Sequence, residues 1–154
     1  MDIQKQKRYP WIKRAVLVGF IILLAGIGLF WYIFTEKFKD IATTNADYTV
    51  NAMDLINEFR QNDSLANKKY VEKILVINGT VFEKEAADTT MNIKFTDTTS
   101  GAYIICAFQQ QHLSEVKNIK EGDLVSIKGS CSGGAYSEIL ETEYITLKRC
   151  ALNK

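Results

Sequence analysis

The chain has 154 residues, which is room for one folded domain and a short N-terminal segment but not for a second hydrophobic core. Its net charge of +1 combines two unlike parts: residues 1–40 contain seven Lys and Arg against three Asp and Glu, whereas residues 41–154 contain twelve against fifteen. The mildly acidic larger part argues against proteins that hold nucleic acid on a broad basic surface.

A run of twenty uncharged residues, AVLVGFIILLAGIGLFWYIF, occupies positions 15–34. This is about the length that crosses a hydrocarbon core roughly 30 Å thick. Thirteen of the twenty are Val, Leu, Ile or Phe, and together they favour insertion by roughly 4 to 8 kcal/mol. Trp11, Trp31 and Tyr32 lie near the two ends, which is typical of aromatic side chains at membrane interfaces. We therefore predict one transmembrane helix over residues 15–34.

The charges that flank this run predict its orientation. Five basic residues precede it: Lys5, Lys7, Arg8, Lys13 and Arg14. Two basic residues that follow, Lys37 and Lys39, are offset by Glu36 and Asp40. We expect residues 1–14 to form a cytoplasmic tail and the domain to lie on the periplasmic or other extracytoplasmic side. A cleaved signal peptide is the alternative, but the run exceeds the usual length of about 7 to 15 residues and ends in bulky side chains, which favours a signal-anchor.

Residues 35–46 are expected to be a linker, followed by one folded domain over residues 47–154. Asn51 can cap a first short helix, NAMDLINEFRQN, and Ser64 a second, SLANKKYVEK. In the second helix Leu65, Ala66 and Tyr70 are expected to face inward. Both helices are predicted to precede every strand.

Alternating apolar residues predict five strands. In chain order they are ILVINGTVFE, MNIKF, AYIICAF, LVSIKG, and a last strand or long hairpin between Glu138 and Cys150. Gly79 permits a sharp bend in the first strand. A short helix, QQHLSEVKNI, is expected after the third strand, and a glycine-rich turn, SGGAY, after the fourth. This order is that of the OB-fold, so the predicted fold class is all-β with short helices, a five-stranded Greek-key barrel.

Four segments carry a family resemblance: YTVNAMDLINEFRQNDSLANKKYVEKILVINGTV, YIICAF, EGDLVSIKGSCSG and ITLKRCAL. Together they resemble the tRNA_anti-like OB-fold family of bacterial exported or membrane-anchored domains, over roughly residues 47–152. The resemblance implies the fold and an exported location, and it assigns no activity. The run SEILETE before the last strand is longer than the family's pattern has it.

No catalytic or metal-binding motif is recognisable in the sequence. His112, the single histidine, has no partner at metal-ligand spacing and is predicted to lie on the surface. No GxSxG elbow accompanies the serines. We therefore expect a protein that is not an enzyme, holds no metal and needs no cofactor.

The chain has three cysteines, so a single disulfide would leave one free thiol. Cys106 alternates with Ile104 and Phe108, which predicts a buried apolar role. The family resemblance places Cys131 and Cys150 in its GSCSG and KRC segments, which implies a disulfide between them in an oxidising compartment. A Cys106–Cys150 pairing stays open, because strands three and five of an OB-fold run side by side.

The expected function is the binding of a protein, peptide or envelope ligand by a membrane-anchored OB-fold domain. Two alternatives stay open: an OB domain that binds single-stranded nucleic acid, and a structural subunit of a membrane complex. The candidate ligand-binding residues are two lysines and two tyrosines: Lys94, Tyr103, Lys128 and Tyr144. Nucleic acid is the weaker expectation, because the domain is acidic and the predicted orientation separates it from cytoplasmic RNA.

Overall fold

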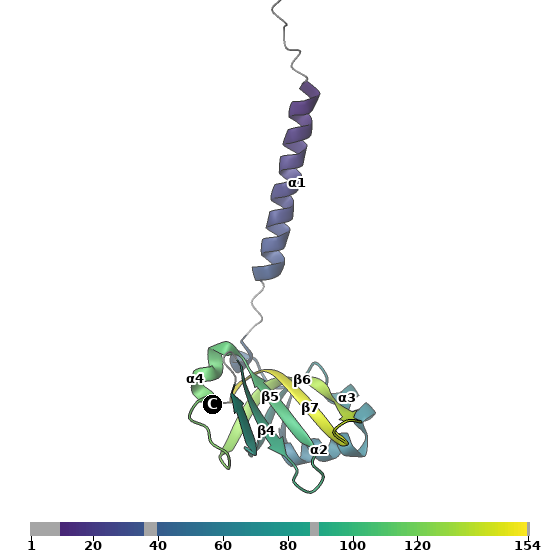
Figure 1. The fold of residues 1–154 in the computed structure, drawn as a ribbon, viewed down its shortest axis with the longest axis vertical. Coiled ribbons are helices and arrows are strands. Elements are labelled where there is room, and N and C mark those ends of the chain that lie inside the picture. The colour runs from purple at the N-terminus through teal and green to yellow at the C-terminus, as the bar shows by residue number, and fades with distance from the viewer. Residues whose placement is uncertain (1–9, 36–39, 87–89, 154) are drawn as a thin grey trace, which may run out of the picture. The chain divides into compact units, whose positions relative to one another are not determined.

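The computed structural model describes residues 10–35, 40–86 and 90–153, which fall into two compact units, Met1–Phe38 and Lys39–Lys154. The described part of the first unit is one long helix. The strands all belong to the second unit (Figure 1).

The helix of the first unit, α1, runs over Pro10–Thr35 and contains the whole predicted segment 15–34. Its part Arg14–Tyr32 has a mean hydropathy of 2.4, and no residue of that part is buried by protein. The helix is therefore long and apolar enough to span a membrane. Most of the flanking charges lie outside the described residues: Lys5, Lys7, Arg8, Glu36, Lys37 and Lys39. The orientation accordingly stays a prediction.

The described part of the second unit contains short helices and strands. In chain order they are η1 (Ile41–Thr43), β1 (Tyr48–Asn51), α2 (Ala52–Gln61), α3 (Asp63–Tyr70), β2 (Ile74–Thr80), β3 (Glu83–Ala86), β4 (Met91–Thr96), β5 (Tyr103–Phe108), η2 (Gln110–His112), α4 (Leu113–Val116), β6 (Leu124–Ser137) and β7 (Thr142–Leu152). The strands form one sheet in the order β1-β2-β6-β7-β5-β4-β3. The pairs β1–β2 and β5–β7 are parallel, and the other pairs are antiparallel.

The sheet curls into a barrel because β2 and β3 are nearly one strand. Only Val81 and Phe82 separate them, although β2 pairs with β6 and β3 pairs with β4. A strand that bends to pair on both sides brings the two ends of the sheet together. The predicted fold class is confirmed: a mostly β, OB-like fold preceded by one apolar helix.

Gly79, near the end of β2, has a role beyond the expected bend. A Cβ atom at this position would lie 2.8 Å from the Cβ atom of Ala52 and 3.0 Å from the ring of Phe95. Glycine therefore lets the first turn of α2 approach the barrel wall. Asn51 caps this helix as predicted, because its Oδ1 accepts a hydrogen bond from the backbone N–H of Met53 at 2.9 Å.

The barrel core follows the predicted alternation of the strands. Along β4, Met91, Ile93 and Phe95 are buried while Asn92 and Lys94 are half-buried. The largest fully buried side chains come from α2, α3, η1 and the strands: Tyr70, Phe59, Phe95, Ile41, Leu55, Ile56, Leu75, Ile77, Ile93, Ile104, Ile127 and Ile145. Burial of each such side chain contributes roughly 1.5–3 kcal/mol. The apolar face of α2 thus completes one barrel core.

The second helix differs from its prediction at its start. Asn62, not Ser64, caps α3, because Asn62 Oδ1 accepts the N–H of Leu65 at 2.9 Å. Leu65 is 64% exposed and does not face inward, whereas Ala66 and Tyr70 are buried as predicted. The prediction that both helices precede every strand was also wrong, since β1 comes first and lies parallel to β2.

Part of the predicted linker 35–46 belongs to the folded domain. Ile41 is 2% exposed, and Lys128 Nζ donates hydrogen bonds to the carbonyl oxygens of Ala42 and Thr44 at 3.3 and 3.1 Å. The domain therefore begins near Asp40 rather than at residue 47. An apolar side chain in a polar stretch gave no periodic pattern from which this packing could be predicted.

The predicted SGGAY turn, residues 132–136, instead belongs to the C-terminal half of the long strand β6. The turn lies at residues 138–141. A Cβ atom at Gly133 would lie 2.6 Å from Asn67 Oδ1, and one at Gly134 would lie 2.6 Å from Cδ1 of Phe59. These glycines let α2 and α3 pack directly on the strand, which is why glycine occurs here without a turn.

Candidate functional site

Three of the four candidate ligand-binding residues lie together on the outer face of the sheet. Tyr103 on β5 pairs with Tyr144 on β7, and their stacked rings have centroids 6.2 Å apart at an interplanar angle of 24°. Lys94 on β4 extends over the same face, with Nζ 5.9 Å from the centroid of the Tyr103 ring. We call these three residues the tyrosine face. The period of two residues in a strand places them outward, because Ile93, Ile104 and Ile145 beside them are buried.

The positive charge of Lys94 is held by two carboxylates. Its Nζ lies 3.1 Å from Glu83 Oε2 and also forms a short hydrogen bond to Glu85 Oε1. The hydrogen bond to Glu85 raises the pKa of Lys94, with a smaller contribution from Glu83, and the bond to Lys94 lowers the pKa of Glu85. The ammonium is thus compensated locally, which leaves less positive charge for a phosphate.

Lys128 does not belong to the tyrosine face. It lies on β6, where it pairs with Val76 of β2. Its ammonium donates to the carbonyl oxygens of Ala42 and Thr44. Lys128 therefore holds η1 and the residue that follows it against the barrel.

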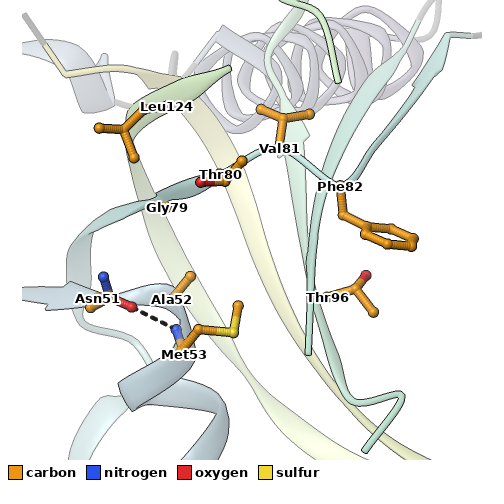
Figure 2. Close-up of a pocket in the computed structure, with 9 residues that line it drawn as sticks. All are labelled: Asn51, Ala52, Met53, Gly79, Thr80, Val81, Phe82, Thr96 and Leu124. Atoms are coloured by element: carbon orange, nitrogen blue, oxygen red, sulfur yellow. Dashed lines mark hydrogen bonds between the residues drawn. The ribbon is translucent and has the colours of Figure 1, made fainter. Parts of the chain in front are cut away.

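An uncharged pocket that was not predicted from the sequence opens where α2 begins (Figure 2). It has a volume of about 350 Å³. Its walls come from α2, the β2–β3 junction and the ends of β4 and β6: Asn51, Ala52, Met53, Gly79, Thr80, Val81, Phe82, Thr96 and Leu124. None of these residues is ionisable, so the pocket offers dispersion contacts and neutral hydrogen bonds but no acid–base chemistry.

Two exposed apolar side chains border this pocket. Leu124 is 80% exposed and Phe82 is 50% exposed. Leu124 begins β6 next to another apolar residue, Val125, and adjacent strand residues point to opposite faces. The dipeptide Leu124-Val125 was therefore the sequence signal for an apolar surface, because one residue of the pair has to face outward.

His112 is buried, which corrects the prediction of a surface residue. It is 7% exposed, and its Nε2 lies 2.8 Å from Asp40 Oδ1. Its Nδ1 lies 3.7 Å from Glu115 Oε1. In the described ranges, no three His, Cys, Asp or Glu side chains are grouped to hold a metal ion. The histidine instead connects the start of the domain to the helical segment after β5.

The sequence profile of the tRNA_anti-like family matches residues 10–150, which include both α1 and the barrel. The chain belongs to the tRNA_anti-like family. The match agrees with the resemblance drawn from the sequence segments and extends it to the N-terminal helix. No curated protein sequence matches the chain significantly.

The tRNA_anti-like domain was compared with solved structures, and one of them with a TM-score above 0.5 shares its fold. One is named a "putative nucleic acid-binding lipoprotein" from Klebsiella pneumoniae; it is 12% identical, has a TM-score of 0.51, and the match covers 77% of this chain and 100% of that one. Another is named a "putative aspartyl-tRNA synthetase" from Leishmania major; it is 9% identical with a TM-score of 0.45, over 77% of this chain. The tRNA_anti-like chain covers 22% of the length of that synthetase.

The three cysteines of the tRNA_anti-like domain are free and buried in the structure. Cys106 and Cys131 both pair with Leu147 in their strand registers, on opposite sides of β7. Burial is the main cause that raises the pKa of Cys150, and the neighbouring thiol of Cys106 raises it further. Of the two pairings left open by the sequence, this proximity favours Cys106 with Cys150.

Proposed function

We propose that this chain is a membrane-anchored binding domain whose tyrosine face and uncharged pocket recognise a polypeptide or envelope ligand. The observation that carries the proposal is the pairing of Lys94 with Glu83 and Glu85 beside the stacked tyrosines. Aromatic rings with a compensated cation suit apolar and hydrogen-bonding groups of a polypeptide. They suit a chain of phosphates poorly.

The uncharged pocket supports the same conclusion. Its volume of about 350 Å³ lies at the lower end of the range of about 300–1,000 Å³ typical of ligand sites. The thioether of Met53 can adjust to different apolar groups, and Thr80 and Thr96 supply neutral hydrogen-bonding groups. An apolar side chain of a bound polypeptide therefore suits the pocket.

A membrane anchor would hold this binding domain at a membrane surface. We propose that α1 is a signal-anchor with its N-terminus in the cytoplasm, because basic residues outnumber acidic residues before it. The barrel would then meet its ligand on the extracytoplasmic side. A tethered domain binds partners in the same membrane or envelope at a raised effective concentration.

Site-specific crosslinking tests the proposed function. The photoreactive residue p-benzoylphenylalanine is introduced in place of Tyr144, and separately in place of Lys117, an exposed residue after α4. We expect illumination of intact membranes to link position 144 to one defined polypeptide or envelope component, identified by mass spectrometry, and position 117 to none. Absence of an adduct at position 144, or equal adducts at both positions, would overturn the proposal.

Single-stranded nucleic acid is the second candidate, and the stacked pair Tyr103 and Tyr144 is the observation that favours it. Bases stack on such rings, and the similar Klebsiella lipoprotein is named for nucleic-acid binding. This candidate predicts binding of the full chain, in zwitterionic nanodiscs, to a labelled oligothymidylate at low salt, with affinity falling steeply as salt rises. We expect no binding at low salt; binding that weakens in Lys94→Gln would establish this candidate in place of the first.

A further inference from the structure

The turn between β6 and β7 presents two apolar side chains to solvent. Ile139 is 93% exposed and Leu140 is 61% exposed. The backbone N–H of Leu140 donates a hydrogen bond to Ser137 Oγ at 3.2 Å, which orders the turn. When a partner covers adjacent large apolar residues of an ordered turn, the free energy falls, so such a turn favours binding.

The surroundings of this turn are acidic. Glu138 and Glu141 flank the two apolar residues in sequence. Beside the turn lies a hollow of about 290 Å³ lined by Arg60, Ser100, Ala102, Tyr136, Glu141, Thr142 and Glu143. Arg60 is the single cation in that lining, and its Nη1 lies 3.9 Å from Asp97 Oδ2. The carboxylates of Glu141 and Glu143 therefore outnumber the one positive charge in the lining.

Two residues that line this hollow each have a buried side-chain oxygen with no hydrogen-bond partner among the described residues: Glu143 Oε1 and Thr142 Oγ1. Buried polar atoms of proteins are nearly always hydrogen-bonded. Burial raises the pKa of Glu143, the nearby charge of Asp63 raises it further, and Arg60 opposes the change. A ligand that brings N–H donors and positive charge would satisfy both oxygens.

We propose that residues 138–143 form a docking surface for a protein segment in which Lys or Arg lies next to an apolar residue. The apolar side chain covers Ile139 and Leu140, and the cationic group enters the hollow and donates to Glu143 and Thr142. Charge complementarity carries the choice of partner, because the acidic flanks repel phosphates and anionic lipid. This inference rests on the proposed function, since it names the chemistry of the polypeptide that the domain binds.

Methyl NMR tests the docking surface directly. The full chain is labelled at its Ile and Leu methyl groups, placed in zwitterionic nanodiscs, and titrated with the short peptide acetyl-Lys-Leu-Lys-Leu-amide. We expect the methyl resonances of Ile139 and Leu140 to shift and saturate while those of Leu152, half-buried at the opposite end of β7 from the turn, stay in place. Matched peptides with Glu for Lys, or Ser for Leu, are expected to need at least about tenfold higher concentrations.

Substitutions separate the acidic contacts from general charge attraction. Glu143→Gln is expected to raise the midpoint of the titration about tenfold, because a charge-assisted hydrogen bond is lost. Glu121→Gln, which removes an exposed carboxylate from another turn, is the control and should leave the midpoint unchanged. The proposed docking surface is wrong if the two variants have the same titration midpoint, or if the peptide with Glu for Lys shifts the methyl resonances of Ile139 and Leu140 as much as the Lys-Leu peptide does. It is also wrong if these resonances shift only with anionic vesicles or with rising concentration of the chain itself.

The two proposals fail separately. If crosslinking from position 144 identifies a polypeptide while the Lys-Leu peptide does not shift the methyl resonances of Ile139 and Leu140, the docking surface is wrong and the proposed function stands. If position 144 gives no adduct and the peptide causes no shift, both proposals are wrong.

Discussion

Nε2 of His112 lies 2.8 Å from Oδ1 of Asp40, although the two residues are 72 positions apart. This contact joins the segment before the first strand to the helical segment after β5. It extends the folded domain to Asp40, ahead of the predicted start at residue 47.

Removal of the Asp40 carboxylate should weaken the domain at neutral pH and flatten its response to acid. The backbone N–H of Ala42 and then His112 hold the pKa of Asp40 below its usual 3.8. A lowered folded-state pKa contributes stability above about pH 4, and this contribution is lost as the pH falls through the folded value. We expect Asp40→Asn to lower the urea midpoint at pH 7, with a smaller difference from wild type at pH 3. Glu121→Gln serves as the control; equal midpoints for Asp40→Asn and wild type at pH 7 would contradict the prediction.

Glu143→Gln should stabilise the domain at neutral pH. Burial, followed by Asp63, raises the pKa of Glu143, so the ionised side chain costs free energy in the folded state. A raised carboxyl pKa removes stability as the pH rises above the usual 4.5, and the cost is absent below that value. Thermal unfolding should show a higher midpoint for the variant at pH 7 and no difference at pH 3.5. A lower midpoint at pH 7 would show that Glu143 makes a net favourable contact in the folded chain.

Gly134→Ala should destabilise the barrel by about 1–3 kcal/mol, because the added Cβ atom would lie 2.6 Å from Cδ1 of Phe59. Chemical denaturation of the full chain in nanodiscs measures the change. Ser132→Ala, at a nearby exposed position of β6, should change the stability by less than about 0.5 kcal/mol. If the two variants are equally stable, α2 does not press on the strand as described.

We propose that the domain, if it is exported as its flanking charges predict, forms a disulfide between the neighbouring thiols of Cys106 and Cys150. The two thiols would lose two protons and two electrons to a disulfide oxidant of the compartment, and the bond would stabilise the domain by about 2–4 kcal/mol. Digestion of protein from the membrane under non-reducing conditions, followed by mass spectrometry, should give the Cys106–Cys150 peptide pair. A Cys131–Cys150 pair would support the pairing implied by the family resemblance instead, and three alkylated thiols would exclude both.

The topology predicts protease sensitivity from one side only. In sealed cells stripped of their wall, protease added outside should digest the domain from residue 47 onward and leave residues 1–34 protected. Exchange of residues 15–34 for an unrelated transmembrane helix should retain crosslinking from position 144 if α1 is only a tether. Loss of that crosslink with the barrel folded would favour a structural subunit of a membrane complex.

Local patterns in the sequence were enough to predict the apolar helix, most of the strands and much of the core, although β1 and β3 were not predicted as separate strands. The uncharged run at positions 15–34 and the alternation of Met91, Ile93 and Phe95 depend only on neighbours a few residues away. The outward positions of Lys94, Tyr103 and Tyr144 follow from the same period of two.

Contacts between distant segments decided the rest. Gly133 and Gly134 gave the usual pattern of a turn, yet α2 and α3 pack on them inside a strand. His112 is buried because Asp40 reaches it, and the charge of Lys94 is compensated because β3 pairs with β4. Strand period and apolar length are properties of the local chain, and the sequence determined them. Which distant side chains meet depends on how the sheet closes into a barrel, and that closure exists only in the tertiary structure.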